Sequence, residues 1–302
     1  MKTAVVILHF NRPGDVAESL RHMAALRAKH EFIVVDNGSS PANAAALTAL
    51  PEMAGVRLIA LPHNIGSCAW DFGAAATEAE IVIKLDDDSH LATASLEVLA
   101  ARFAAEPDLG AIPLAVEGGP FPCPDRPAYR RGTSVGFIGC GVAFRKAALL
   151  RAGGHDPNFF IYADEWDLAV RLLSAGYEID REASIRVVHR VAQTAGRTSP
   201  RLIVYTTRNE VLMARKYFRQ TRYLRLIARI ACRNLQRFRR TGGIRTVWYV
   251  LQGLALALCD RRVSTVPLPA PAALLARYEA WMFAFRPLFR RRRPPKPTAK
   301  AT

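Results

Sequence analysis

The amino-acid sequence predicts an α/β protein whose mostly parallel sheet is covered by helices and followed by a basic, mainly helical extension. Apolar runs of strand length alternate with segments of helical periodicity from residue 3 to about residue 190. The charge is divided, since residues 197–302 hold 24 Lys and Arg against three acidic residues, a balance of +21, whereas residues 1–196 carry −5. We therefore divide the chain into an α/β unit over residues 1–196, a basic helical region over residues 197–286 and a flexible basic tail over residues 287–302.

Four predicted strands build the first half of the sheet. Helical crossovers between them predict parallel pairing, and ligands of such sheets bind beyond the carboxyl ends of the strands. The predicted strands cover residues 3–10, 31–40, 56–62 and 81–88, with helices at 15–29 and 65–79 between them. The polar residues at the strand ends, which we expect to surround one crevice, are His9, Asn11, Asp36, Asn64, Asp86, Asp87 and Asp88.

The three adjacent carboxylates of residues 86–88 repel one another. Directly after a buried strand, this triplet predicts a bound divalent cation or a substrate, with a solvated acidic turn as the alternative. The other strand ends also have structural interpretations. Asp36 is typical of a turn, Asn64 is typical of a helix cap, and His9 is compatible with the edge of the core.

A second acidic cluster opens a predicted helix. Asp164, Glu165 and Asp167 fall in its first turn, where the helix dipole favours carboxylates without any chemical role. The alternative is that a carboxylate held beside Trp166 acts as a general base. Both interpretations remain open from the pattern alone.

Two further features carry candidate site residues. The Gly-, Pro- and Arg-rich segment 116–141, which contains Arg130 and Arg131, predicts a loop that shapes specificity or acts as a lid. A plain solvated loop is the alternative. His189 ends a short predicted strand over residues 185–190 and is either a metal ligand or a structural histidine.

The composition excludes several protein classes. An apolar content of 50% with 23% charged residues is typical of a globular protein rather than a disordered one. The five cysteines are scattered without a CxxC pair, which disfavours a disulfide framework and a structural zinc site. The segment "MKTAVVILHFNRPGD" lacks the long apolar run of an export signal, so we expect a cytoplasmic protein.

The basic C-terminal third predicts contact with a polyanion. Residues 205–240 interleave arginines with apolar residues, and Leu224, Ile227 and Ala228 are expected on the apolar face of a basic interfacial helix. The apolar run 246–259 is too short to span a membrane. We expect an anionic membrane surface as the partner. Nucleic acid is disfavoured, because no zinc-ligand spacing or RNA-binding aromatic signature accompanies the charge.

Six segments, in this order, resemble the family 2 glycosyltransferases of the nucleotide-sugar-binding GT-A type, whose fold is Rossmann-like. They are "VVILHFNRPGD", "IVVDNGSS", "LPHNIGS", "IVIKLDDDS", "GFIGCGVAFRKAALLRAGGHDPNFFIYADEWDLAVRLLSAGY" and "VVHR". The resemblance implies transfer of a sugar from a nucleoside-diphosphate donor. With one candidate base and no matching nucleophile, a single displacement that inverts the anomeric carbon is the simplest mechanism.

The resemblance implies roles for the strand-end residues. Asp36 would meet the nucleobase or ribose, and Asn64 and Gly66 would flank the pyrophosphate. The expected donor-binding residues are His9, Asn11, Asp36, Asn64, Gly66, Asp86 and Asp87. The expected ligands of Mg or Mn, which would bridge the diphosphate, are Asp86, Asp88 and His189.

The resemblance also implies a catalytic pair. Glu165 occupies the position of the base that removes the acceptor proton, and Asp164 would orient the acceptor, although the order of the two acids is reversed relative to the family. We treat them as a pair. Trp166, Arg130 and Arg131 are the candidates for acceptor or lid contacts.

Donor and acceptor are narrowed only to classes. Trp70 and Asp71 stand where many members carry Asn or Arg, so the donor stays open between UDP- and dTDP-sugars, with rhamnose and galactofuranose as leading candidates. "RNEVLMARKY" is similar to the end region of bacterial enzymes that build surface polysaccharides on lipid carriers. We expect a lipid-linked or growing glycan acceptor and a peripheral position on the inner face of the cell membrane.

Two other functions remain open. A nucleotidyltransferase also uses paired aspartates and a metal, but it releases pyrophosphate and has no need of the second acidic cluster. A non-catalytic homologue that binds nucleic acid or membrane would keep the fold without the reaction.

Overall fold

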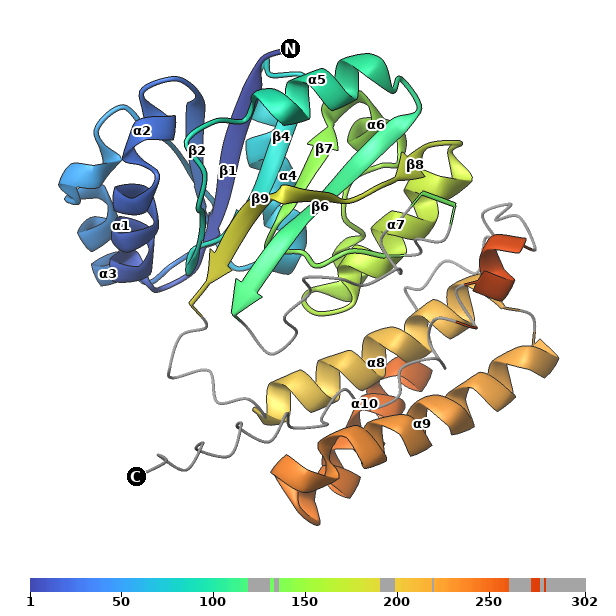
Figure 1. The fold of residues 1–302 in the computed structure, drawn as a ribbon. Helices are drawn as coiled ribbons and strands as arrows, with labels where there is room; N and C mark the ends of the chain where they lie inside the picture. The colour runs from blue at the N-terminus through green and yellow to red at the C-terminus, as the bar shows by residue number, and fades with distance from the viewer. Residues whose placement is uncertain are drawn as a thin grey trace, which may run out of the picture.

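The computed structural model describes residues 1–118, 131–132, 136–190, 199–218, 220–260, 273–277 and 280. Its sheet has the strand order β3-β2-β1-β4-β7-β6-β9-β5, with β8 beside β6 (Figure 1). The strands are β1 (Thr3–His9), β2 (Glu31–Asp36), β3 (Arg57–Ala60), β4 (Ile81–Asp86), β5 (Ser89–Leu91), β6 (Leu109–Gly118), β7 (Val142–Arg145), β8 (Glu178–Ile179) and β9 (Glu182–His189).

The predicted parallel half of the sheet is present. β1 pairs in parallel with β2 and β4, and β2 pairs in parallel with β3. β7 runs antiparallel to both β4 and β6, and β5 runs antiparallel to β9. Because the carboxyl ends of β1, β2 and β4 lie at one edge, the polar residues that follow them come together there.

Helices cover both faces of the sheet, as Figure 1 shows. One core cluster lies between one face and α1, α2, α3 and α5, and the other lies between the opposite face and α4, α6 and α7. Along β1, Val5 and Ile7 belong to the first cluster and Val6 to the second, as the two-residue period of a strand requires. These helices are α1 (Pro13–His22), α2 (Ala24–Arg27), α3 (Pro41–Thr48), α4 (Trp70–Ala76), α5 (Glu97–Ala105), α6 (Lys146–Arg151) and α7 (Asp164–Ser174).

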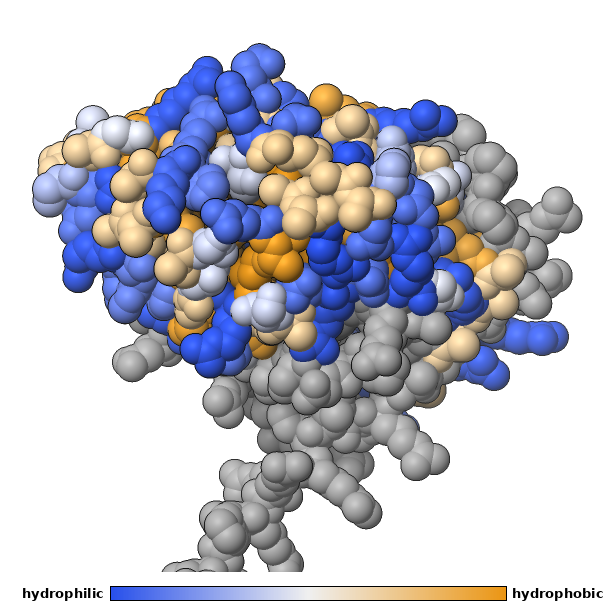
Figure 2. Space-filling view, turned by 45° about the horizontal axis from the view of Figure 1, so that its top comes forward, coloured by the Kyte–Doolittle hydropathy of each residue, from blue (hydrophilic) through white to orange (hydrophobic). Residues whose placement is uncertain are grey.

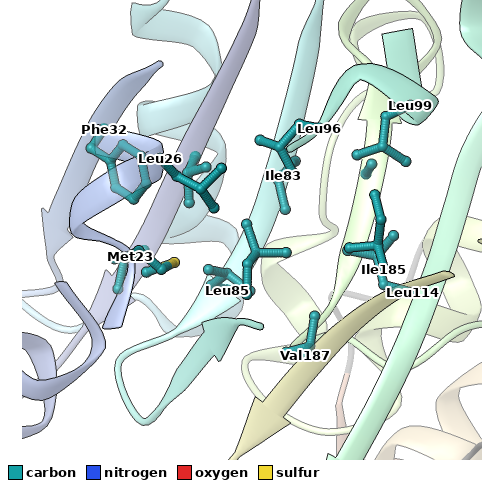
Figure 3. Close-up of a cluster of buried hydrophobic side chains, with 14 of the residues drawn as sticks. Met23, Leu26, Phe32, Ile83, Leu85, Leu96, Leu99, Leu114, Ile185 and Val187 are labelled. Atoms are coloured by element: carbon teal, nitrogen blue, oxygen red, sulfur yellow. The ribbon is translucent and has the colours of Figure 1, made fainter. Parts of the chain in front are cut away.

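Figure 3 shows the first cluster in detail. Met23 and Leu26 approach the sheet from the α1–α2 side, and Ile83 and Leu85 of β4 project toward the same layer. Their side chains are at most 1% exposed, so this apolar layer holds the strand that carries the acidic triplet.

The C-terminal region forms three packed helices, α8 (Pro200–Tyr217), α9 (Gln220–Gly242) and α10 (Arg245–Cys259). α8 lies between the sheet unit and the other two helices (Figure 1). A third apolar cluster joins it to α7 through Val170, Val211 and Leu212, with Leu226 of α9 and Ala257 of α10. The basic region is therefore packed onto the sheet unit rather than appended to it.

The structure corrects the predicted interfacial helix over residues 205–240. This segment divides into α8 and α9, and α8 is buried on most of its surface. The packed face of α9 carries Leu226 and Ile230, whereas Leu224 is 65% exposed and Ala228 is also exposed. The helical register was ambiguous because apolar residues lie on more than one side of α9.

Among the described residues of the C-terminal region, the exposed apolar side chains lie mainly on α10 and the turn before it. Ile244 is 90% exposed and Trp248 67%, and Leu251 and Leu258 follow on the same side at helical spacing. By contrast, the face of the sheet unit drawn in Figure 2 is mainly hydrophilic, with smaller hydrophobic areas between. Within the described residues, no helix is both long and apolar enough to cross a lipid bilayer.

Candidate functional site

The loops after β2 and β3 are tied together by Asn37. Its side-chain amide donates to Asn64 Oδ1 and to the Gly66 carbonyl, both at 3.1 Å, and its Oδ1 accepts from the Ile65 N–H at 2.9 Å. Asp36 is buried and accepts from the Ser39 N–H at 3.1 Å, so it also forms the turn. The structure thus brings together Asp36, Asn64 and Gly66, and Asn37, which was not among the predicted site residues, organises them.

Gly66 belongs to the loop after β3, which we call the donor-side loop because a donor is expected to bind there. It joins this loop to the segment that precedes the second acidic cluster. Ser67 N–H donates to the Phe160 carbonyl at 2.6 Å. A Cβ atom at Gly66 would lie 2.1 Å from that carbonyl oxygen, and the φ of Gly66 is +82°. Both the left-handed backbone and the close approach require glycine here.

His9 and Asn11, at the end of β1, have structural partners. The His9 ring is fully buried, with Nδ1 3.4 Å from Asp87 Oδ2. Asn11 Oδ1 accepts from the Ser40 N–H at 2.8 Å, and the Asn11 N–H donates to Ser39 Oγ at 2.8 Å. These contacts fix the β1 and β2 loops side by side at the edge where the donor was expected.

Arg12 neutralises part of the acidic triplet. Its guanidinium forms an ion pair with Asp87 and another with Asp88 at 3.1 Å. Asp87 also accepts from the Phe10 N–H at 3.3 Å, so it is held from two sides. Asp86 is the partly exposed member of the triplet, whereas Asp87 and Asp88 are buried.

A group of side chains that could hold a metal includes the first residue of the triplet, Asp86. Ligand atoms of Asp86, Cys140 and His189 all lie within 4.8 Å of one another. Asp88 Oδ1 lies 3.1 Å from His189 Nε2. Carboxylate oxygen with imidazole nitrogen is a donor set that fits Mn better than Mg, and the thiol of Cys140 adds a softer ligand.

The charges around this group favour a cationic partner for the carboxylates. Burial alone would lower the pKa of His189, but its hydrogen bonds to Asp88 and Cys140 raise that pKa to about 11. Burial raises the pKa of Asp86, and its two carboxylate neighbours add to the shift against the opposing effect of His189. A metal bound at His189 would have to displace its proton.

Asp164 and Glu165, which we call the acidic pair, begin α7 directly after a strained loop. Phe160, Tyr162 and Ala163 have φ values between 57° and 66°, which non-glycine residues rarely adopt. The buried Asn209 of α8 holds this loop, because its amide nitrogen lies 2.6 to 2.8 Å from the carbonyl oxygens of Phe159, Ile161 and Tyr162.

Asp164 and Glu165 differ in environment. Asp164 is 5% exposed, and its Oδ2 lies 3.8 Å from Lys84 Nζ, whereas Glu165 is half-buried. Burial and the adjacent Asp164 carboxylate raise the pKa of Glu165 to about 8. A carboxyl group with such a pKa is suited to general base catalysis near neutral pH.

The three predicted acceptor or lid residues fall in different places. Trp166 is half-buried against the cluster that joins α7 to α8. Arg131 lies at the opposite end of the sheet, where its guanidinium binds Asp108 and Glu106 at 2.6 Å, so its predicted position at the site is wrong. The acidic residues that precede β6 bind this arginine and hold it away from the site. Arg130 lies outside the described residues.

A hollow of about 620 Å³ opens beside the strained loop. It lies between the loop, α8 and the carboxyl end of α10, and Phe160 and Tyr205 line it with ring centroids 5.7 Å apart. Arg208 and Asp260, paired at 2.5 Å, form its polar side.

Four functional candidates were missed by the sequence analysis: Arg12, Asn37, Cys140 and Asn209. Arg12 and Asn37 each follow a polar strand end, so their positions shortly after His9 and Asp36 in the sequence could have indicated a role at the site. Cys140 and Asn209 gave none, because their partners lie 49 and about 50 residues away in the sequence.

Known structures share this architecture. The mannosyltransferase PcManGT from Pyrobaculum calidifontis, solved with GDP-Man and Mn2+, matches with a TM-score of 0.56 and 19% identity over 94% of this chain and 88% of that chain. TarS from S. aureus, residues 1–349 in complex with UDP-GlcNAc, matches with a TM-score of 0.56 and 15% identity over 95% and 93%. GalNAc-T7 with UDP, GalNAc and Mn2+ has a TM-score of 0.58 and 14% identity over 85% of this chain and 57% of that chain. The predicted GT-A fold is confirmed.

Residues 4–152 match the family model described as Glycosyl transferase family 2. Over these residues, just under half of the chain, the protein is similar to the family 2 glycosyltransferases. No curated protein sequence matches the chain.

Proposed function

We propose that the protein is a metal-dependent, inverting glycosyltransferase that moves a sugar from a nucleoside diphosphate to a lipid-linked or growing surface glycan. One observation carries this proposal. The donor-side loop at Gly66 and Ser67 is bonded directly to the loop that presents Asp164 and Glu165, at the edge where β4 delivers residues 86–88.

The reaction needs a donor, an acceptor hydroxyl and a base in one crevice. The hydroxyl proton passes to the acidic pair at Asp164 and Glu165, and the acceptor oxygen forms a bond to the anomeric carbon. The bond from that carbon to the diphosphate oxygen breaks, and its electron pair leaves with the nucleoside diphosphate. Attack opposite the leaving group inverts the anomeric carbon.

Asp86, Asp88 and His189 are the proposed holders of Mn or Mg, with Cys140 beside them. When bound, the metal would stabilise the negative charge of the departing diphosphate as a Lewis acid. Support comes from the 4.8 Å grouping of Asp86, Cys140 and His189 and from the Mn2+ of the two solved relatives named with it.

The proposed acceptor subsite is the hollow beside Phe160 and Tyr205. Aromatic faces with adjacent polar groups suit a sugar ring, whose C–H bonds pack on the rings while its hydroxyls bond to groups such as Arg208 and Asp260. The hollow adjoins the loop that leads into Asp164, which supports its use by the acceptor.

The proposed location is the inner face of the cell membrane, where the protein would be peripheral. The exposed apolar side of α10 and the +21 charge of residues 197–302 support contact with an anionic lipid surface. A lipid-linked acceptor would be reached from there.

The test is release of nucleoside diphosphate from UDP-, dTDP- and GDP-sugars, including dTDP-rhamnose and UDP-galactofuranose, with Mn or Mg and a polyprenyl-linked acceptor. We expect release from one donor, abolished by chelator, and reduced by at least about 100-fold in Asp88→Ala and Glu165→Ala. The inverted configuration of the product is read by NMR of the glycosidic proton.

Matched controls keep the outcome clear. Glu117→Ala removes an exposed carboxylate whose partner is Arg186 and should leave release unchanged. Pyrophosphate as the product would identify a nucleotidyltransferase instead. Absence of both donor binding and product with acceptor present would overturn the proposal.

A further inference from the structure

A row of polar side chains, two of them buried, lies beside the acidic pair. It runs from Asp71 on α4 through His155, in the loop after α6, to Lys84 on β4. Lys84 is 3% exposed and His155 4%. None of these three residues has a role in the reaction described above. The side chain of Asp71 is 24% exposed, and the cost of burying Lys84 and His155 has to be offset by contacts within the row.

The distances define the direction of the hydrogen bonds. Lys84 Nζ lies 2.9 Å from His155 Nε2, and because an ammonium group can only donate, Nε2 is the acceptor. Nδ1 then carries the hydrogen and donates to Asp71 Oδ1 at 2.7 Å. The His155 backbone N–H donates to the second oxygen, Asp71 Oδ2, at 2.6 Å, so the carboxylate grips both the ring and the backbone of His155.

The row ends on the acidic pair. Asp164 Oδ2 lies 3.8 Å from Lys84 Nζ and 3.9 Å from His155 Nε2. The ammonium of Lys84 is the nearest cation to this 5% exposed carboxylate among the ion pairs of the described residues. Lys84 and His155 therefore approach the same oxygen of Asp164.

The surroundings allow little rearrangement. Trp70 is fully buried, its ring centroid lies 5.8 Å from Lys84 Nζ and 5.9 Å from the His155 ring, and its indole N–H donates to the Val6 carbonyl at 2.9 Å. A Cβ atom at Gly154 would lie 2.5 Å from Asp71 Oδ2, so only glycine admits the carboxylate there. Burial would raise the pKa of Asp71, but His155 holds it below its usual range.

We infer that Asp71, His155 and Lys84 form a positioning chain that holds the Asp164 side chain in place beside Glu165. The inference rests on the proposed function. It gives a role to Asp71, His155 and Lys84, which the proposed reaction does not use.

Two charges act on Glu165 in opposite directions. The Asp164 carboxylate raises the pKa of Glu165, and the Lys84 ammonium lowers it. Glu165 therefore gains a proton as the pH falls below about 8, and catalysis by its carboxylate increases as the pH rises through that value. The charged or titratable groups of the acidic pair and the positioning chain are Asp164 and Glu165 on α7, Lys84 on β4, His155 after α6, and Asp71 on α4.

The test follows the Glu165 carboxyl carbon by 13C NMR over pH in protein labelled at glutamate, with the resonance assigned from Glu165→Gln. In Lys84→Met we expect the midpoint to move up by about 1 pH unit, and in Asp164→Asn to move down by about 1 unit or more. Lys146→Met, which removes a lysine bonded to the Thr77 carbonyl, should leave it in place. Thermal unfolding of each variant verifies that it is folded.

Asp71, the member of the positioning chain farthest from the acidic pair, is tested by a separate measurement. Asp71→Asn should lower kcat for transfer with little change in the donor KM, because both oxygens of Asp71 bind His155, whose ring lies beside Asp164. The pH profile of kcat should shift with the NMR midpoint in Lys84→Met and in Asp164→Asn.

The results separate the inference from the proposed function. Midpoints that stay in place, or that move in the same direction in Lys84→Met and Asp164→Asn, would overturn the positioning chain even in an active enzyme. Midpoints that move as stated in a protein without transferase activity would support the chain and overturn the proposed function. A donor KM that rises in Asp71→Asn at constant kcat would also contradict the chain.

Discussion

A single buried amide, that of Asn209, holds the loop that leads into the acidic pair. Its nitrogen is shared among three carbonyl oxygens, those of Phe159, Ile161 and Tyr162. The left-handed conformations in this loop are costly, by about 1 to 3 kcal/mol for each residue, and persist only where surrounding contacts impose them. The orientation of Asp164 and Glu165 therefore depends on a residue of the C-terminal region.

Replacing Asn209 by alanine is predicted to release this loop. We expect kcat to fall by about 100-fold, since small misplacement of a catalytic group has effects of that size. The protein should stay folded but lose about 1 to 3 kcal/mol of unfolding free energy, because the carbonyls lose their donor. Steady-state kinetics and urea unfolding measure the two effects, and wild-type kcat would contradict the role given to Asn209.

Gly66 has the same importance on the donor side. In Gly66→Ala the new Cβ would collide with the Phe160 carbonyl, so the loop has to move. We predict weaker donor binding, by about tenfold or more, measured by calorimetry with the nucleoside diphosphate. Gly14→Ala is the matched control, because a Cβ there meets nothing within 4 Å and the φ is not positive. Equal affinities in the two variants would refute the prediction.

At the scale of elements, α8 connects the site to the other C-terminal helices through buried polar groups. Glu210 is fully buried, pairs with Arg233 of α9, and accepts from the Asn234 amide at 2.8 Å. Asn234 also donates to Thr207 at 3.1 Å. Such contacts fix the register of two helices, since a displaced pairing would leave the charges uncompensated.

Removing the Glu210 carboxylate should destabilise the protein strongly. For Glu210→Ala we expect a loss of about 3 to 5 kcal/mol, because Arg233 keeps its charge in a mostly buried position. The exposed pair of Glu117 and Arg186 is the control, and Glu117→Ala should cost about 1 kcal/mol or less. Urea unfolding of both variants decides the matter, and similar losses would show that burial of the pair has no special effect.

At the scale of the molecule, basic charge and exposed apolar surface both lie in the C-terminal region. The apolar side of α10 includes Trp248 and Leu251, which are 67% and 53% exposed. This combination is typical of proteins that lie on anionic lipid surfaces. It agrees with the proposed use of a lipid-linked acceptor.

Trp248→Glu is predicted to weaken binding to vesicles that contain anionic lipid by about tenfold or more, because an apolar side chain would be lost from the lipid interface and a negative charge added. Cosedimentation measures it, and binding of the wild type should fall as salt rises. Leu150→Glu changes a residue of similar exposure, 56%, on α6 of the sheet unit and should have little effect. Equal losses in both variants would place the membrane contact elsewhere.

The sequence by itself determined the parallel half of the sheet and the convergence of its polar strand ends. Those features depend on local periodicity and on short crossovers, which are encoded in neighbouring residues. It also located both acidic clusters and the basic region. It misplaced Arg131 and the apolar face of α9, because the partners of an arginine and the burial of a helix face depend on distant segments.

Only the tertiary structure decided which residues act together at the site. Asn209 reaches a loop about 50 residues earlier in the chain, His155 joins Asp71 across 84 residues, and Cys140 approaches His189 across 49. No periodicity marks such pairs, because each is formed when packed elements bring their ends together. The different environments of Asp164 and Glu165, which are adjacent in sequence, have the same origin. Lys84 of β4 lies beside Asp164, and its positive charge lowers the pKa of Glu165.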